Sequence, residues 1–245
     1  TVHSKDSRSM NRRLNSLLGI ALCVGALPLA AQTPPVHTLG ESAALKLGDL
    51  SSHADLAEFQ SLPHLYALGP VTRMGGEVTV FDSQPAVALV REGKVTVSNS
   101  WAFQPPFFVY SQVPHWQAIA LPDSVQTFAD IQAFIESIAA DQGIDLEQAF
   151  AFRVTAKAAH LDYHVFNMPP AAEVGAQPLS TYNTAWKTGQ SDVELLGFYS
   201  RHHEGVFLGT GARMHIHFRA ANGTEAGHVD GFQLAAGGQL WLPQS

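Results

Sequence analysis

Short runs that alternate apolar and polar residues dominate the first half of this chain. Four of them follow one another at residues 64–71, 76–83, 85–93 and 94–101. Alternation over roughly four to eight residues is typical of half-buried β-strands, and Gly, Asp and Ser at the junctions supply turns. The pattern predicts an antiparallel meander, followed by a strand pair at 107–121.

One segment, residues 121–143, has a helical period instead. Its apolar side chains recur at the spacing of a single helix face, namely at Phe128, Ile131, Ile135 and Ile138. Asp123 or Ser124 could cap the start of this helix, and Gly143 could end it.

The second half of the chain returns to β-type sequence. Residues 149–167 are expected to form a long strand or hairpin, and 168–190 a loop-rich bridge before a last set of strands. Strands, one helix and strands again favour an α+β fold over alternating βαβ units. We therefore predict two mixed or antiparallel β-sheet subdomains with few helices, and a metal site on the C-terminal strands.

The predicted division of the chain has five parts. They are an upstream extension (1–9), a signal peptide (10–31), a surface lead-in (32–54), an N-terminal β-rich subdomain with one helix (55–167) and a C-terminal metal-binding β subdomain (168–245).

The signal peptide is predicted from a positive segment, an apolar segment and a small-residue cleavage site. These are Arg12 and Arg13, Leu17–Leu29 and Ala30–Ala31. The apolar run is short for a membrane span of about 20 residues. A secreted or periplasmic protein without a membrane anchor is expected, and retention of the segment as an N-terminal anchor is the alternative.

Cysteine content and charge exclude several functions. Cys23 is the only cysteine and lies within the predicted signal peptide, so the mature chain would have no disulfide, thiolate metal site or cysteine nucleophile. Residues 1–31 hold four basic side chains and one acidic side chain, so their removal changes the net charge from −7 to −10. Such an acidic chain is poorly suited to nucleic acids or anionic membranes. A small-molecule partner is expected.

Three histidines near the C-terminus form the candidate metal site. On a strand, His215 and His217 would point to the same face, about 7 Å apart. A two-residue turn at Asn222-Gly223 would place His228 directly opposite His217, unless a bulge at Gly227 shifts the register. Three imidazoles suit zinc, and also iron, copper or nickel, and leave coordination positions open for catalysis. The alternative is a solvated strand edge with one core histidine.

Several segments, in order, resemble the α-acetolactate decarboxylase family. The segment 214–218 followed by Gly227-His228-Val229 resembles the zinc motif of that family. Tyr66–Pro70 with Gly76–Asp82, the run 150–154 and Gly197-Phe198 resemble other family segments, and the likeness covers roughly residues 55–235.

The resemblance implies a zinc-dependent decarboxylase that converts 2-acetolactate, a 2-hydroxy-3-oxo acid, to acetoin. His215, His217 and His228 would hold Zn²⁺, Arg153 would stabilise the substrate carboxylate and the developing enolate, and Glu77 would donate the proton. Family members often form homodimers.

The sequence departs from the family in one respect. The family usually contributes a second glutamate from beyond the zinc histidines, whereas the last glutamate here is Glu225. Asp230 and Glu204 are possible substitutes. The alternating residues His160, Asp162 and His164 are interpreted as a solvated strand face, and a second site lined by them is the alternative.

Two other functions remain open. One is a non-catalytic protein that binds a metal or small molecule on the same scaffold. The other is a cupin-like metalloenzyme, in which a His-x-His pair also occurs. That reading requires a glutamate soon after the pair, and residues 218–223 contain none.

Overall fold

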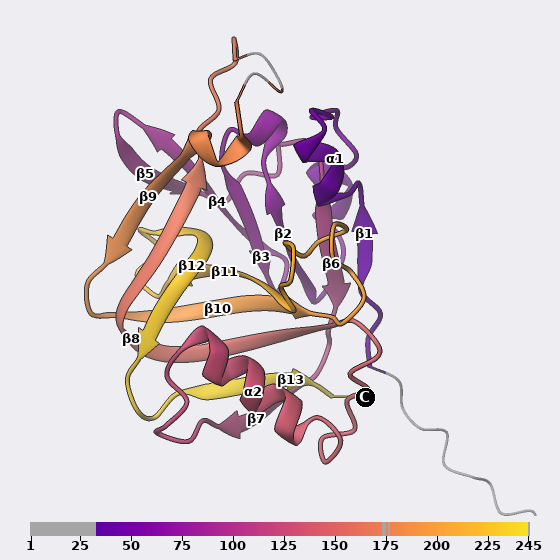
Figure 1. Ribbon diagram of the computed structural model, residues 1–245, viewed down its shortest axis with the longest axis vertical. Helices are drawn as coiled ribbons and strands as arrows, with labels where there is room; N and C mark the ends of the chain where they lie inside the picture. The colour runs from indigo at the N-terminus through magenta and orange to yellow at the C-terminus, as the bar shows by residue number, and fades with distance from the viewer. Residues whose placement is uncertain (1–32, 173–174, 176, 245) are drawn as a thin grey trace, which may run out of the picture. The chain divides into compact units, whose positions relative to one another are not determined.

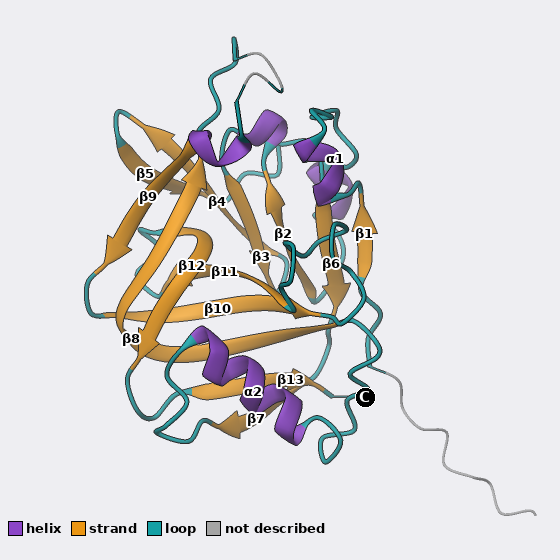
Figure 2. Cartoon of the chain, viewed as in Figure 1, coloured by secondary structure: helices purple, strands orange, loops and turns teal. Residues whose placement is uncertain are grey.

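A computed structural model describes residues 33–172, 175 and 177–244 of the chain (Figure 1). The extension and signal peptide predicted at 1–31 lie outside these residues. Within them strands predominate and helices are few, as Figure 2 shows, which confirms the α+β class. None of the helices in this part of the chain combines the length and apolar character that crossing a bilayer requires.

The first sheet has six antiparallel strands in the order β1-β6-β2-β3-β4-β5. They are β1 (His37–Leu39), β2 (Leu65–Pro70), β3 (Glu77–Phe81), β4 (Gln84–Arg91), β5 (Lys94–Ser98) and β6 (Phe108–Gln112). Consecutive pairing of β2, β3, β4 and β5 confirms the predicted meander.

The segment 32–54, predicted as a surface lead-in, is partly packed into the fold. It supplies β1, which pairs with β6, and the short helix α1 (Ser42–Lys46). Leu45 and Leu50 are buried in it, so this segment contributes to the core.

The second sheet has seven strands, with the path β10-β11-β12-β8-β13-β7. They are β7 (Trp116–Ala120), β8 (Phe150–Phe166), β9 (Asn183–Thr188), β10 (Ser191–Tyr199), β11 (Met214–Ala220), β12 (Ala226–Leu234) and β13 (Gln239–Pro243). β8 pairs with β10 near its start and with β12 near its end, so β8, β10, β11 and β12 form a closed ring.

The sheets do not divide the chain at residues 167 and 168, where the subdomain boundary was predicted. β7 and β8 precede that point but belong to the second sheet, because β8 is long enough to pair with four other strands. β9 lies in the expected loop-rich bridge, and its pairing with β8 gives that polar segment a strand conformation.

The predicted helix is α2 (Phe128–Ile138), and it starts later than Asp123 or Ser124. Thr127 is its N-cap, and its side chain and that of Asp130 form a reciprocal capping box. Ile131 and Ile135 pack into the core of the second sheet. The other short helical turns are the 3-10 segments η1 (Leu56–Phe59), η2 (Thr72–Met74) and η3 (Leu179–Tyr182).

Alternation along β3 decides what lies between the two sheets. Val78 and Val80 pack into an apolar cluster with η1, on the face of the first sheet that points away from the second. Glu77, Thr79 and Phe81 point the other way, because successive side chains alternate across a strand. Two polar side chains therefore lie buried between the sheets.

Candidate metal centre

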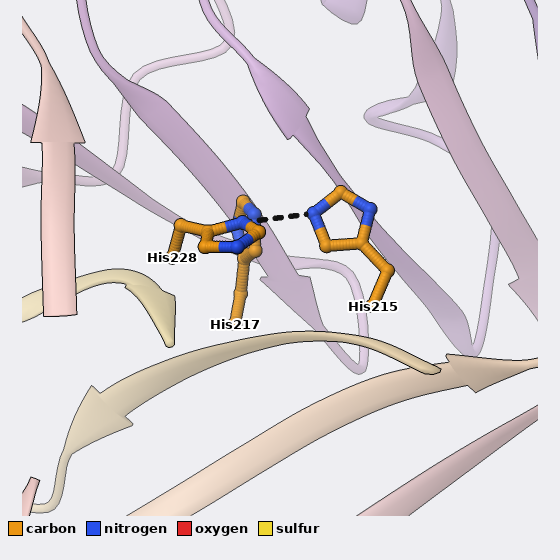
Figure 3. Close-up of side chains that lie close together, drawn as sticks. All are labelled: His215, His217 and His228. Carbon is orange, nitrogen blue, oxygen red and sulfur yellow. Dashed lines mark hydrogen bonds between the residues drawn. The ribbon is translucent and has the colours of Figure 1, made fainter. Parts of the chain in front are cut away.

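The three predicted histidines come together on the face of β11 and β12 that points toward the first sheet. His217 lies opposite His228 in the β11–β12 register, which confirms the predicted pairing. The loop contains residues 221–224 rather than two residues, since the Ala220 N–H donates to the Glu225 carbonyl at 2.8 Å. The ring centroids lie 4.8–5.3 Å apart, and Figure 3 shows the rings converging.

In two of these rings the outer nitrogen, Nδ1, has a hydrogen-bond partner elsewhere in the protein. The inner nitrogen, Nε2, then remains available as a metal ligand. His215 Nδ1 donates to the Phe207 carbonyl at 2.8 Å. His217 Nδ1 lies 3.1 Å from Thr79 Oγ1, whereas its buried Nε2 has no hydrogen-bond partner among the described residues. A metal-bound histidine usually donates its other ring N–H in this way.

The spacing of the inner nitrogens fits a small cation. His215 Nε2 lies 3.0 Å from His228 Nδ1, and ligand atoms of all three histidines lie within 4.8 Å of one another. Two nitrogens bound tetrahedrally at zinc would be about 3.3 Å apart. The donor set, the orphaned Nε2 of His217 and this spacing therefore fit Zn²⁺.

Burial keeps the three imidazoles neutral, which is the form that binds metal. Desolvation is the largest cause of each shift and lowers the pKa of His215 to about 4. It also lowers the pKa values of His217 and His228 well below the usual value, and repulsion from His215 adds to the effect.

Glu77 on β3 lies beside this cluster, where the sequence placed it. Its side chain is 2% exposed, and Oε2 is 3.7 Å from His217 Nε2. Burial raises the pKa of Glu77 well above the usual value, opposed by a hydrogen bond from the Phe166 backbone. Oε1 has no partner among the described residues. Burial thus favours the neutral form of this carboxyl, which lies next to the candidate metal position.

His164 is a site residue that the sequence interpretation missed. It pairs with His228 across β8 and β12, is 7% exposed, and its ring centroid is 4.6 Å from that of His228. His160 and Asp162 are partly exposed, as expected for a strand face. The alternation indicates that the three residues share one face of β8, but it does not show that only His164, at the end of that face, is buried.

Asp230 accepts the hydrogen bond that orients His164. Its carboxylate lies 2.8 Å from His164 Nδ1, and the residue occupies a bulge in β12 between Val229 and Gly231. Bulges commonly redirect a side chain in this way. Asp230 and Glu204 were the two suggested substitutes for the family's second glutamate. Asp230 lines the cavity at the site, and Glu204 does not.

Arg153, the predicted anion-binding residue, is not among the residues that line the cavity at the site. In the second sheet Arg153 on β8 pairs with Leu196 on β10, and Leu196 pairs with His217 on β11. The Nε of Arg153 donates to Glu194 at 3.0 Å. Glu194 also accepts from Arg219, at 2.8 Å. The guanidinium of Arg153 is enclosed by aromatic rings of Tyr66, Trp116 and Trp241. The Glu194 carboxylate that it contacts is partly buried, with a side chain that is 15% exposed.

A cavity of about 990 Å³ opens onto the histidines. Glu77, His164, His215, His228 and Asp230 line its polar part. Two of the three candidate ligands, His215 and His228, thus share one concave site with the Glu77 carboxyl and the oriented imidazole of His164, which suits metal-assisted chemistry on a small molecule.

Known proteins share this fold. Acetolactate decarboxylase from Bacillus subtilis strain 168 has a TM-score of 0.68 at 14% identity, with 86% of each chain covered. The enzyme from Bacillus subtilis subspecies spizizenii has a TM-score of 0.68 at 16% identity, again with 86% of each chain covered. A Staphylococcus aureus protein of unknown function, similar to α-acetolactate decarboxylase, has a TM-score of 0.68 at 17% identity, with 85% of this chain and 84% of that chain covered.

No curated protein matches this chain significantly. The family model described as "Alpha-acetolactate decarboxylase" matches residues 43–242. This match spans most of the sequence, and the chain belongs to the α-acetolactate decarboxylase family.

Proposed function

We propose that this protein is an exported, zinc-dependent decarboxylase that converts 2-acetolactate to acetoin. His215, His217 and His228 would hold the zinc. The observation that carries the proposal is the convergence of three imidazoles beside the buried carboxyl of Glu77, in a chain of this family.

The reaction breaks the bond between the carboxylate carbon and C2, and CO₂ leaves. A zinc ion bound at the site supplies a Lewis acid for the negative charge that develops on the substrate oxygens. The electron pair left on the substrate must then take up a proton.

Glu77 is the proton donor in this proposal. It is buried and lies 3.7 Å from the inner nitrogen of His217, so a substrate held at the histidines would contact its carboxyl group. Its low exposure limits the access of water to the carboxyl group.

His164 is the candidate for the substrate-binding role that the resemblance assigned to Arg153. Asp230 accepts from its Nδ1, and this fixes the ring and leaves Nε2 for a ligand in the cavity. We propose that His164 positions the polar end of the substrate and that Arg153 has a structural role.

Acetoin formation tests the proposal. The purified full chain, loaded with zinc, is given racemic 2-acetolactate, and acetoin is followed over time. Wild-type protein should form acetoin and His217→Ala should not. His202→Ala is the matched control, because His202 is exposed and bonds to Glu147 away from the cavity. About one zinc per chain without acetoin would favour a non-catalytic metal-binding protein instead.

Export rests on the sequence of residues 10–31 and has its own test. Mass measurement of protein recovered from outside the cytoplasm should give a chain that begins at Gln32. Recovery of the full-length chain in the cytoplasm alone would contradict export without affecting the proposed chemistry.

A further inference from the structure

The cavity at the candidate metal centre is larger than 2-acetolactate requires. Its volume of about 990 Å³ is at the upper end of the range of roughly 300–1,000 Å³ that accommodates drug-sized ligands. 2-Acetolactate is much smaller, with only two methyl groups outside its carboxylate, hydroxyl and ketone. Most of the cavity would therefore lie beyond the reach of that substrate.

The wall away from the polar part is apolar. Four parts of the fold contribute its side chains: α1, the segment after β2, the segment before β6, and the loop between β10 and β11. The residues are Leu45, Met74, Phe107, Phe207 and Leu208. All five belong to one buried cluster, so the wall is a packed surface and not a set of isolated side chains.

This apolar wall is continuous with the candidate metal centre. The ring of Phe107 stacks on His215, with centroids 5.9 Å apart. Phe207 accepts the hydrogen bond from His215 through its carbonyl, and its side chain packs in the wall. A substrate whose oxygens lie at the histidines would thus extend directly along these aromatic rings.

We infer that the preferred substrate is a 2-hydroxy-3-oxo acid in which a larger alkyl or aryl group replaces one methyl of 2-acetolactate. The inference rests on the proposed function. The same carbon–carbon bond breaks, CO₂ leaves and one proton is added, and the substituent takes no part in the chemistry. Its contribution is binding, because each methylene buried on the wall increases affinity about fourfold.

A substrate series tests the inference. The zinc-loaded full chain is assayed for CO₂ release with 2-acetolactate and with analogues that carry butyl or phenyl in place of the acyl methyl. kcat/KM should rise with the apolar group by about fourfold per buried methylene. A maximum at 2-acetolactate would overturn the inference and leave the proposed function standing. CO₂ release from no member of the series would count against the proposed function.

Binding gives a readout that does not depend on turnover. The matching 2,3-dihydroxy acids cannot lose CO₂ by this route, and their Kd values can be measured by calorimetry. Kd should fall as the apolar group grows. A Kd that is independent of the group would overturn the inference even if 2-acetolactate is turned over.

Two tryptophan variants locate the effect. Leu45→Trp places a larger side chain in the cavity at the apolar wall. The ratio of kcat/KM for the butyl substrate to kcat/KM for 2-acetolactate should then fall by at least about fourfold. Leu47→Trp is the matched control on the same segment, because Leu47 is 89% exposed and does not line the cavity. The control should keep the wild-type ratio, and a ratio unchanged in both folded variants would contradict the role of this wall.

Discussion

His217 on β11 lies directly opposite His228 on β12, with ring centroids 5.3 Å apart, and the His217 ring lies next to Glu77 and Thr79 of the other sheet. The hairpin register and the packing of two sheets therefore act together. The hairpin brings the imidazoles to one position, and the first sheet supplies the groups that orient and bury them.

Thr79→Val should weaken zinc binding. The valine keeps the shape of the side chain but removes the oxygen that lies 3.1 Å from His217 Nδ1. Loss of such an orienting partner typically lowers metal affinity by about tenfold to a hundredfold. Competition with a zinc chelator measures the change, and Thr96→Val on the exposed strand β5 should retain wild-type affinity.

Arg153→Met should lower stability and leave zinc affinity unchanged. The guanidinium contacts Glu194 and three aromatic rings and does not line the cavity. Thermal unfolding should report a lower Tm. Loss of acetoin formation in folded, zinc-loaded Arg153→Met would show instead that this residue acts in the reaction.

Glu194→Ala should destabilise the protein more than Arg153→Met does. Glu194 separates Arg153 from Arg219, and its removal leaves two neighbouring guanidinium groups without their carboxylate. Breaking such a buried network costs up to about 3–5 kcal/mol, and the cost is lower here because the side chain of Arg219 is 34% exposed. Denaturant unfolding gives the two free energies, and a smaller loss in Glu194→Ala would contradict this account.

Gly227→Ala should disturb the pairing of β12 with β8. A Cβ atom at this position would lie 2.8 Å from the backbone oxygen of His164. The expected cost is about 1–3 kcal/mol, as for overpacking in a core. Gly231→Ala on the same strand is the control, because a Cβ atom there meets nothing within 4 Å. Equal unfolding free energies for the two variants would contradict the close approach.

The capping box of α2 should make stability depend on acid pH. Hydrogen bonds from the Thr127 side chain, its backbone and the Gln126 backbone lower the pKa of Asp130 below 3.8. A carboxyl with a depressed pKa stabilises the fold above its unfolded pKa, and this is lost as the pH falls through the folded pKa. Wild-type protein should therefore lose stability below about pH 4, and Asp130→Asn should lack this part of the loss in denaturant titrations.

The part of the site that lies within one hairpin could be predicted from the sequence, whereas the site residues that come from strands far away in the sequence could not. The pairing of His217 with His228 follows from one hairpin, in which the register depends only on nearby residues. His164 joins the site through the pairing of β8 with β12, and the sequence contains no local signal for that pairing. Its burial depends on which end of the 17-residue strand the first sheet covers.

Arg153 shows a second limit of sequence interpretation. Its apolar neighbours indicate correctly that the charge needs an anionic partner, but they do not identify the partner as Glu194 rather than a substrate. The start of α2 at Thr127 instead of Asp123 or Ser124 has a similar cause. Several residues there are good caps, and the packing of Ile131 and Ile135 decides which one is used.

X-ray absorption at the zinc edge tests the central claim most directly. The full chain is loaded with zinc and dialysed, and the first coordination shell is measured for wild-type protein and His228→Ala. Three imidazole nitrogens at about 2.0–2.1 Å in the wild type, and fewer in the variant, are predicted. A first shell without imidazole nitrogens, or no zinc retained by the folded wild type, would contradict the claim that these histidines bind one ion.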